Sequence, residues 1–151
     1  MSATAGVIAP PPLIYGIPLL AGLLADRWHP WPLITERTTV PEGLIMVLLG
    51  FVAVPAVLAF RKARTHPELW KPTKALVTVG PYRYSRNPMY VGFTLCYAGI
   101  AIWQNSVWPL LALPVVIAVM RVGVIKREER YLEGLFGDDY RAYRDQVRRW
   151  F

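Results

Sequence analysis

Charge is missing from long stretches of this 151-residue chain, and cysteine and histidine are nearly absent from all of it. Cys96 is the only cysteine, so neither an internal disulfide nor a cluster of thiolate metal ligands can form. Because Cys96 lies within an apolar run, we expect it to be a packing residue. We interpret the two histidines, His29 and His66, as loop residues and predict no metal site.

Three segments carry no Asp, Glu, Lys or Arg: Ser2 to Ala25, Gly43 to Phe60 and Asn87 to Met120. Roughly 17–25 apolar residues in a helix are enough to cross a bilayer core of ~30 Å. We therefore predict an all-α integral membrane protein with a single domain over residues 1–151. Its expected parts are about four transmembrane helices, near 12–25, 43–60, 88–103 and 107–125, and a cytoplasmic C-terminal helical segment at 126–151.

The first two spans contain internal prolines. Pro18 and Pro55 should each kink their helix, because proline removes a backbone hydrogen bond and its ring clashes with the preceding turn. The first span is also short, so a tilted or re-entrant segment is an alternative to a full crossing. The aromatic run Trp28 to Pro32 that follows is typical of a membrane interface.

The placement of the net charge of +7 indicates a membrane orientation. Seven basic residues lie between Arg61 and Arg86, and seven more lie between Lys126 and Arg149. The connections at 26–42 and 104–106 have no such excess. Because short Lys- and Arg-rich loops stay cytoplasmic, we predict a multi-pass protein with both termini in the cytoplasm. Anionic lipid headgroups are then the expected partner of the basic surface, and a nucleic-acid role is disfavoured.

The fourth span contains one charge, Arg121. On a regular helix, Arg121, Ile125 and Glu128 would form one stripe running from the membrane into the cytoplasm. The alternative is an arginine that snorkels to the interface beside a solvated charged turn. We expect the helix to continue to Phe136.

The end of this helix has its own sequence signals. Gly137 is the expected C-cap, and Asp138 the expected N-cap of a following helix. Tyr140 and Tyr143 recur at helical spacing and should face the protein or the membrane surface.

A polar segment from Gly80 to Tyr90 precedes the third span. Pro88 suits the first position of a helix, and Asn87 before it is a preferred cap. A plain helix start explains these two residues. It does not explain why two arginines and three tyrosines crowd a helix end that a membrane hairpin would bring opposite Glu128 and Glu129. Such a mixture suits a ligand with an aromatic base, hydroxyl groups and a charged tail.

Two runs carry a resemblance to a known family: Val79 to Gly92, and Arg127 to Leu132 followed by Phe136 to Tyr143. Their order and spacing resemble the isoprenylcysteine carboxyl methyltransferase and phospholipid N-methyltransferase superfamily, in its bacterial form. The similarity covers about half the chain. It implies an enzyme of the bacterial inner membrane that transfers a methyl group from S-adenosylmethionine to a lipid-like or small amphipathic acceptor at the cytoplasmic face.

The resemblance also implies site residues. Glu128 and Glu129 match the family's acidic cofactor-binding pair, and Arg86 to Tyr90 matches its Arg-His-Pro-x-Tyr element, with Asn87 in place of the usual His. This departure puts prenylated cysteine in doubt as the acceptor. We assign catalytic roles to Arg86, Asn87 and Glu128. The residues assigned to cofactor binding are Gly80, Tyr82, Arg83, Pro88, Tyr90, Glu128, Glu129 and Tyr140.

Two choices stay open within this assignment. Either Arg83 or Arg86 would pair with the cofactor carboxylate. Glu129 would bind the ribose hydroxyls or the ammonium group, with Glu128 as its alternate. Two other functions compete: an NADPH-dependent membrane reductase related to sterol reductases, and a non-enzymatic membrane protein that binds anionic lipid.

Overall fold

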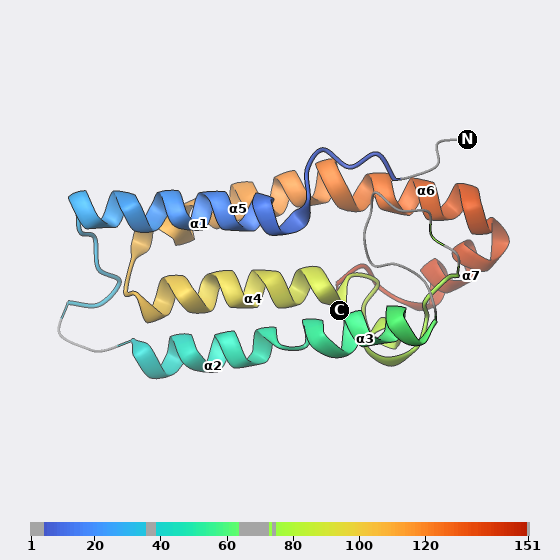
Figure 1. Ribbon diagram of the computed structural model, residues 1–151, viewed down its shortest axis with the longest axis horizontal. Coiled ribbons are helices and arrows are strands. Elements are labelled where there is room, and N and C mark those ends of the chain that lie inside the picture. Colours follow the sequence, from blue (N-terminus) through green and yellow to red (C-terminus); the bar gives the residue numbers. More distant parts are fainter. Residues whose placement is uncertain (1–4, 36–38, 64–72, 74, 151) are drawn as a thin grey trace.

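The described part of the chain is a bundle of long apolar helices that ends in a smaller polar region (Figure 1). The computed structural model describes all residues except 1–4, 36–38, 64–72, 74 and 151. His66 and much of the linker after the second span therefore lie outside the described residues. The helices are α1 (Pro11–Trp28), α2 (Val40–Gly50), α3 (Ala53–Lys62), the 3₁₀ turn η1 (Gly80–Arg83), α4 (Pro88–Trp103), α5 (Val107–Val119), the π-helical turn η2 (Met120–Ile125), α6 (Lys126–Phe136) and α7 (Asp138–Gln146).

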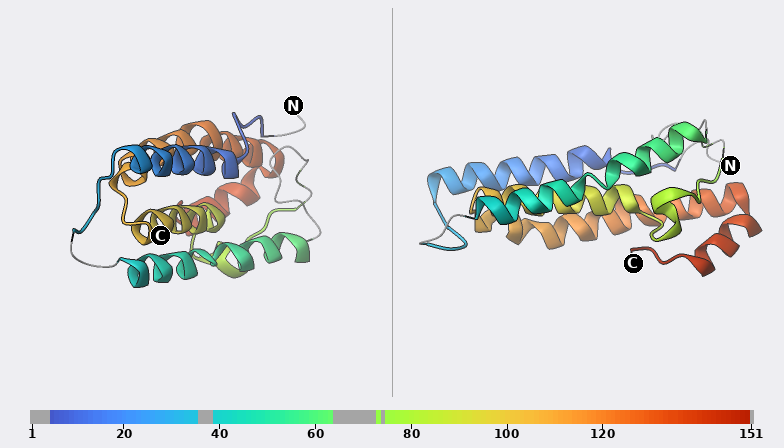
Figure 2. Two further views of the ribbon diagram at one scale, coloured as in Figure 1. Left: turned by 60° about the vertical axis from the view of Figure 1, so that its left-hand side comes forward. Right: turned by 90° about the horizontal axis from the view of Figure 1, so that it is seen from below.

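Helix α4 is the centre of the bundle, with α2 packed on one side and α1 and α5 on the other (Figure 2). Its closest neighbour is α2, and glycines line the contact: Gly43 and Gly50 on α2, Gly92 and Gly99 on α4. A Cβ atom at any of the four would lie within 3.0 Å of the facing helix. The thiol of Cys96 lies beside Gly50, which agrees with the predicted packing role.

The second predicted span is one apolar stretch interrupted at Phe51 and Val52, between α2 and α3. Pro55 explains the position of the break, because it cannot donate a hydrogen bond to the carbonyl of Phe51 and its ring crowds that group. The amide of Val54 instead donates to the Phe51 carbonyl at 2.9 Å. The predicted disruption by Pro55 is confirmed one turn upstream of the proline. Pro18, in contrast, lies inside α1 without interrupting it.

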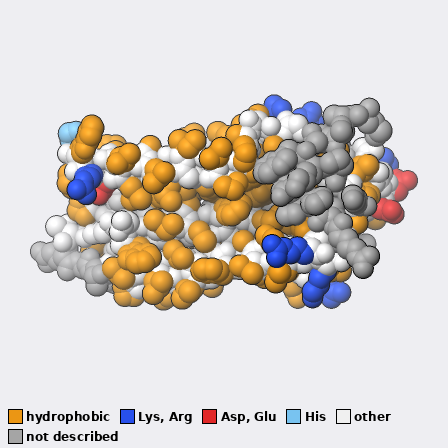
Figure 3. Space-filling view, in the orientation of Figure 1, with side chains coloured by type: hydrophobic (Ala, Val, Ile, Leu, Met, Phe, Trp, Pro, Cys, Tyr) orange, Lys and Arg blue, Asp and Glu red, His pale blue; other side chains and the backbone are white. Residues whose placement is uncertain are grey.

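Two helical stretches are long and apolar enough to cross a membrane, Val40–Lys62 and Val107–Phe136. Only 22% and 33% of their most apolar windows are buried inside the protein. Large apolar side chains such as Leu48 and Val115 are exposed, and hydrophobic side chains spread over the face of the bundle seen in Figure 3. An extensive apolar surface of this kind needs an apolar surrounding, which is consistent with a membrane. Helix α4 is apolar but shorter, and α1 is not among the two stretches.

The loop after α1 and the turn between α4 and α5 meet at one end of the bundle (Figure 1). The Val107 amide donates to the Trp31 carbonyl at 3.0 Å, and the Leu33 amide donates to the Asn105 carbonyl at 3.2 Å. The ring centres of Trp31 and Trp108 are 5.6 Å apart. The predicted hairpin of the last two long helices is therefore present, and α6 and α7, which carry several basic residues, lie at the opposite end of the bundle (Figure 1).

The helix that follows the hairpin runs to Phe136, as predicted, but it is not regular. A π-helical turn at Met120–Ile125 shifts its register, which sequence spacing did not indicate. Arg121 is exposed whereas Ile125 is fully buried, so the predicted stripe through these residues to Glu128 is wrong.

Gly137 ends α6 with a φ of 52°, a conformation that glycine adopts readily. It serves as C-cap of α6 and N-cap of α7. Asp138, predicted as the N-cap, is instead the first residue of α7 and pairs with Arg141 at 2.7 Å. Its carboxylate still lies at the positive end of the helix dipole, where acidic residues are favourable.

Candidate active site

The polar segment before α4 forms a tight turn. Gly80 has a φ of 64° and begins η1, so the chain reverses there with little strain. The turn buries Tyr82, whose ring packs on Phe60 of α3 with centres 5.4 Å apart. Pro88 then occupies the first turn of α4, as predicted.

Asn87 is the residue that caps α4, but its side chain makes no capping hydrogen bond. Its amide nitrogen donates instead to the backbone carbonyl of Arg149, at 3.0 Å. The expected position is confirmed and the expected side-chain contact is wrong. This contact is with a segment more than 60 residues away in the sequence, so no local pattern indicated it.

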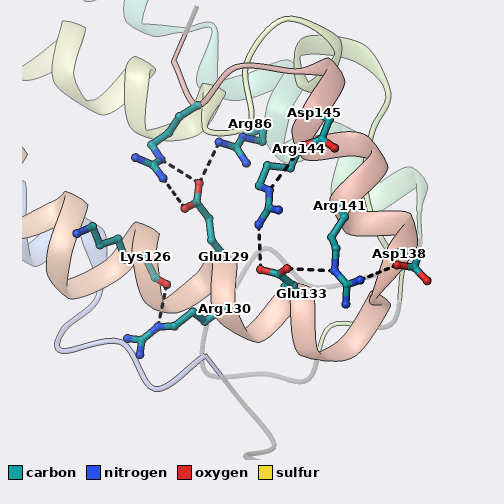
Figure 4. Close-up of polar contacts among 10 residues, drawn as sticks. Arg86, Lys126, Glu129, Arg130, Glu133, Asp138, Arg141, Arg144 and Asp145 are labelled. Atoms are coloured by element: carbon teal, nitrogen blue, oxygen red, sulfur yellow. Dashed lines mark hydrogen bonds and ion pairs between the residues drawn. The ribbon is translucent and has the colours of Figure 1, made fainter.

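The two acidic residues of the second motif lie in the first turn of α6 and contact different partners. The hydroxyl of Tyr90, on α4, donates to Glu128 at 2.9 Å. Glu129 accepts two hydrogen bonds from Arg149, at 2.9 and 2.7 Å, and lies 3.4 Å from a terminal nitrogen of Arg86 (Figure 4). The two motifs, about 40 residues apart in sequence, are thus joined directly by Tyr90–Glu128 and Arg86–Glu129.

A cavity lies where the motifs meet. The space free of atoms there amounts to about 590 Å³, a figure that includes open solvent at the mouth. It combines one basic side chain, two acidic ones and aromatic rings. The residues that line it are Phe60, Thr73, Ala75, Leu76, Val77, Tyr82, Arg86, Asn87, Glu128, Glu129, Leu132, Tyr140 and Tyr143.

Helix α7 contributes two tyrosines to the cavity. Tyr140 is 2% exposed, and the hydroxyl of Tyr143 donates to the Tyr82 carbonyl at 2.8 Å, which ties α7 to η1. Burial raises the pKa of Tyr140 to about 12, and the charge of Glu129 acts in the same direction while Arg86 opposes it. Burial also raises the pKa of Tyr143 well above its usual value. Both rings are therefore neutral at physiological pH.

Arg86 is the most distinctive residue of the cavity. Its side chain is 10% exposed. Two of its nitrogens, Nε and Nη1, are buried and have no hydrogen-bond partner of good geometry among the described residues, although the guanidinium lies close enough to the Tyr140 hydroxyl to oppose the rise of its pKa. A buried guanidinium N–H without an acceptor is costly, so this arrangement suits an anionic ligand group.

The structure separates the predicted site residues into three groups. Tyr82, Arg86, Asn87, Glu128, Glu129 and Tyr140 line the cavity. Pro88 and Tyr90 lie behind it, buried in α4, and Tyr90 reaches the site through Glu128. Gly80 and Arg83 are exposed and are not among the lining residues.

Sequence reasoning missed several residues of the site. Phe60, Leu132 and Tyr143 line the cavity, and Arg149 binds Glu129 from the end of the chain. Tyr143 was predicted to face the protein or the membrane surface, but nothing in its spacing related it to η1. Arg149 is one of several arginines in a basic tail, so no local pattern distinguished it.

These features define a helical protein of membrane type with a polar cavity at one end of its apolar bundle. The family model described as phospholipid methyltransferase matches residues 39–139, which include the first motif and the second as far as Asp139. The chain belongs to the phospholipid methyltransferase family, and the predicted superfamily is confirmed.

Known relatives agree with this family. The chain is similar to protein-S-isoprenylcysteine O-methyltransferase of Schizosaccharomyces pombe, with 38% identity over 48% of this chain and 30% of that protein. It is 30% identical to protein-S-isoprenylcysteine O-methyltransferase A of Arabidopsis thaliana, over 70% of this chain and 55% of the relative. It is also 30% identical to methanethiol S-methyltransferase 1 of Bradyrhizobium diazoefficiens, over 83% and 48% of the two chains. The matches thus span about half or less of these relatives, and no solved structure matches the chain.

Proposed function

We propose that this protein transfers a methyl group from S-adenosylmethionine to a lipid-like or small amphipathic acceptor at the cytoplasmic membrane face. The observation that carries the proposal is the cavity in which the buried guanidinium of Arg86 and the carboxylate of Glu129 lie together. An anion-binding and a cation-binding group side by side match the carboxylate and ammonium groups of an amino-acid ligand.

The residues of the cavity fit this donor. Arg86 would bind the donor carboxylate, and we favour it over Arg83 because Arg83 is exposed outside the lining. Glu129 would bind the ammonium group or the ribose hydroxyls. Neutral tyrosine rings such as Tyr140 can favour a nearby cation through the negative face of the ring. When bound, S-adenosylmethionine supplies an electrophilic methyl group on a sulfonium that is already a good leaving group.

Glu128 is the residue we assign to the acceptor side. Its carboxylate is held by the Tyr90 hydroxyl and lies in the same lining as Glu129. An amine or thiol acceptor must lose a proton on methylation, and Glu128 is the group placed to receive it. A carboxylate acceptor would need no base, and Glu128 would then only shape the site.

The position of the cavity supports an amphipathic acceptor. It lies at the end of a bundle whose apolar side chains face outward, so an acceptor with an apolar part would concentrate beside it. Positioning the acceptor and the methyl group together, away from water, is the main task that remains for the protein. The names of the relatives include both a lipid-modified cysteine and a small thiol, so they agree with either kind of acceptor.

A binding titration on the purified protein tests the proposal. We expect saturable binding of S-adenosylhomocysteine and none of NADPH. Replacing Arg86 with Gln should weaken that binding by about 10- to 150-fold, because hydrogen bonds to charged groups contribute ~1.5–3 kcal/mol. Arg83→Gln removes the same charge from an exposed neighbour and should change affinity less than about twofold.

The other possible results of the titration would reject the proposal or the assignment of Arg86. Binding of NADPH alone would replace the proposal with a reductase, and binding of neither ligand would favour the lipid-binding scaffold. An equal loss for Arg83→Gln and Arg86→Gln would reject the assignment of the carboxylate to Arg86.

A further inference from the structure

The last described residues of the chain, 147–150, return to the candidate site after α7. We call this segment the C-terminal strap. Val147 is extended and ends α7, and the strap then runs beside the turn that precedes α4. The Arg86 amide donates to the Arg148 carbonyl at 3.0 Å. The Arg149 carbonyl accepts from Asn87 at 3.0 Å and from the Ser85 hydroxyl at 3.2 Å.

The side chain of Arg149 points the other way, to the second motif. Its Nε and one terminal nitrogen hold the two oxygens of Glu129, at 2.9 and 2.7 Å. A single residue therefore binds the first motif through its backbone and the second motif through its side chain. Trp150, the next residue, packs against the apolar cluster that contains Tyr90.

From this geometry we propose that Arg149 is a positioning residue for the donor site and acts through the Glu129 carboxylate. This inference rests on the proposed function, because it assumes that Glu129 binds the methyl donor. The fork of a guanidinium fixes both oxygens of a carboxylate in one plane, which a single contact does not do. Arg86 makes only one contact with Glu129, at 3.4 Å, and so does not fix its orientation.

The surroundings of the pair separate it from an ordinary surface ion pair. The side chain of Glu129 is 16% exposed and that of Arg149 is 28% exposed. Surface pairs contribute little because water and salt screen them, whereas a shielded bidentate pair holds its geometry. The hydrogen bonds to Glu129, and to a lesser extent its charge, also raise the pKa of the Arg149 guanidinium, which keeps the pair ionised.

The test compares Arg149→Gln with Arg148→Gln in the full chain, using S-adenosylhomocysteine as the probe. Arg148 precedes Arg149, carries the same charge and has an exposed side chain, so it is a matched control. We expect Arg149→Gln to weaken binding at least tenfold and Arg148→Gln to weaken it less than twofold. Arg149→Lys, which keeps the charge but not the fork, should restore only part of the affinity.

A double-mutant cycle distinguishes positioning from a general structural effect. If Arg149 acts through Glu129, adding Arg149→Gln to Glu129→Gln should cause no further loss of affinity. Additive losses, or equal effects of the two arginine variants, would overturn the inference. If Arg149→Gln does not fold, the same cycle is run with Arg149→Lys. Failure of the unsubstituted protein to bind the probe would instead refute the proposed function.

Discussion

The body of α4 and its first turn are held in place by different kinds of contact. Along most of its length α4 packs on α2 through glycines, and the contact depends mainly on shape. At its beginning it meets α6, η1 and the C-terminal strap through charged groups and hydroxyls. The difference shows how the protein separates two tasks. Close apolar packing sets the distance between helices, and a small set of polar contacts orients the groups that we assign to binding.

The largest effect on stability is expected at the glycine contact between α2 and α4. Leucine at Gly99 would place atoms within 2.7–2.8 Å of the backbone of α2, at the Val47 nitrogen and the Gly43 oxygen. We expect a destabilisation of about 3 kcal/mol, the upper part of the range for overpacked cores. Thermal unfolding in detergent would measure it, together with loss of S-adenosylhomocysteine binding. Gly16→Leu is the control, because nothing lies within 4 Å of that position; equal destabilisation of both variants would contradict the role of the glycine contact.

The second effect concerns binding rather than folding. Glu129→Gln should weaken S-adenosylhomocysteine binding by about 10- to 150-fold, because the neutral amide loses the charge that we assign to the donor. Calorimetric titration would measure the change. Glu133→Gln is the control, since Glu133 lies one turn further along α6 and also pairs with two arginines. Unchanged affinity of Glu129→Gln would remove Glu129 from the site.

A third substitution separates binding of the donor from methyl transfer. Tyr90→Phe removes the hydroxyl that holds Glu128 but keeps the buried ring. We expect about a tenfold loss of turnover with little change in donor affinity, since a hydrogen bond to a charged group contributes ~1.5 kcal/mol or more. A radiolabelled methyl-transfer assay with membrane lipid extract would measure the turnover. Tyr97 is on the same helix as Tyr90, and Tyr97→Phe, which loses a buried hydrogen bond to the Pro109 carbonyl of α5, should affect stability only.

The smallest effect is expected at the exposed ion pairs of α6 and α7. Glu133 contacts Arg141 and Arg144, and these side chains are 35–53% exposed. Glu133→Gln should lower the free energy of unfolding by only ~0.2–1 kcal/mol, because water screens such pairs. High salt should remove the difference between the variant and the unsubstituted protein. A loss of several kcal/mol would mean that exposed pairs hold α7 in place. It would contradict the expected difference between these pairs and the shielded pair of Glu129.

Much of this architecture could be predicted from the sequence. Charge-free runs predicted the long apolar helices, because transfer of charge into hydrocarbon is costly. Long runs without charge are therefore typical of helices that cross a membrane. Pro55 predicted an interruption, Gly137 a helix end, and the two motifs the family. These signals are local, since each depends on composition or on backbone chemistry within a few residues.

Other features could not be predicted from the local sequence. The π-helical turn at Met120–Ile125 shifted the register of the helix, so the face of Arg121 could not be obtained from a period of 3.6. The sequence left Arg83 and Arg86 as alternatives for the cofactor carboxylate, and only packing buried Arg86 and exposed Arg83. Arg149 gained its partner because α7 turns the chain back over the motifs. Long charge-free apolar runs determine which segments form the long helices, whereas the partner of a long charged side chain depends on which surfaces the folded chain brings within a few ångströms.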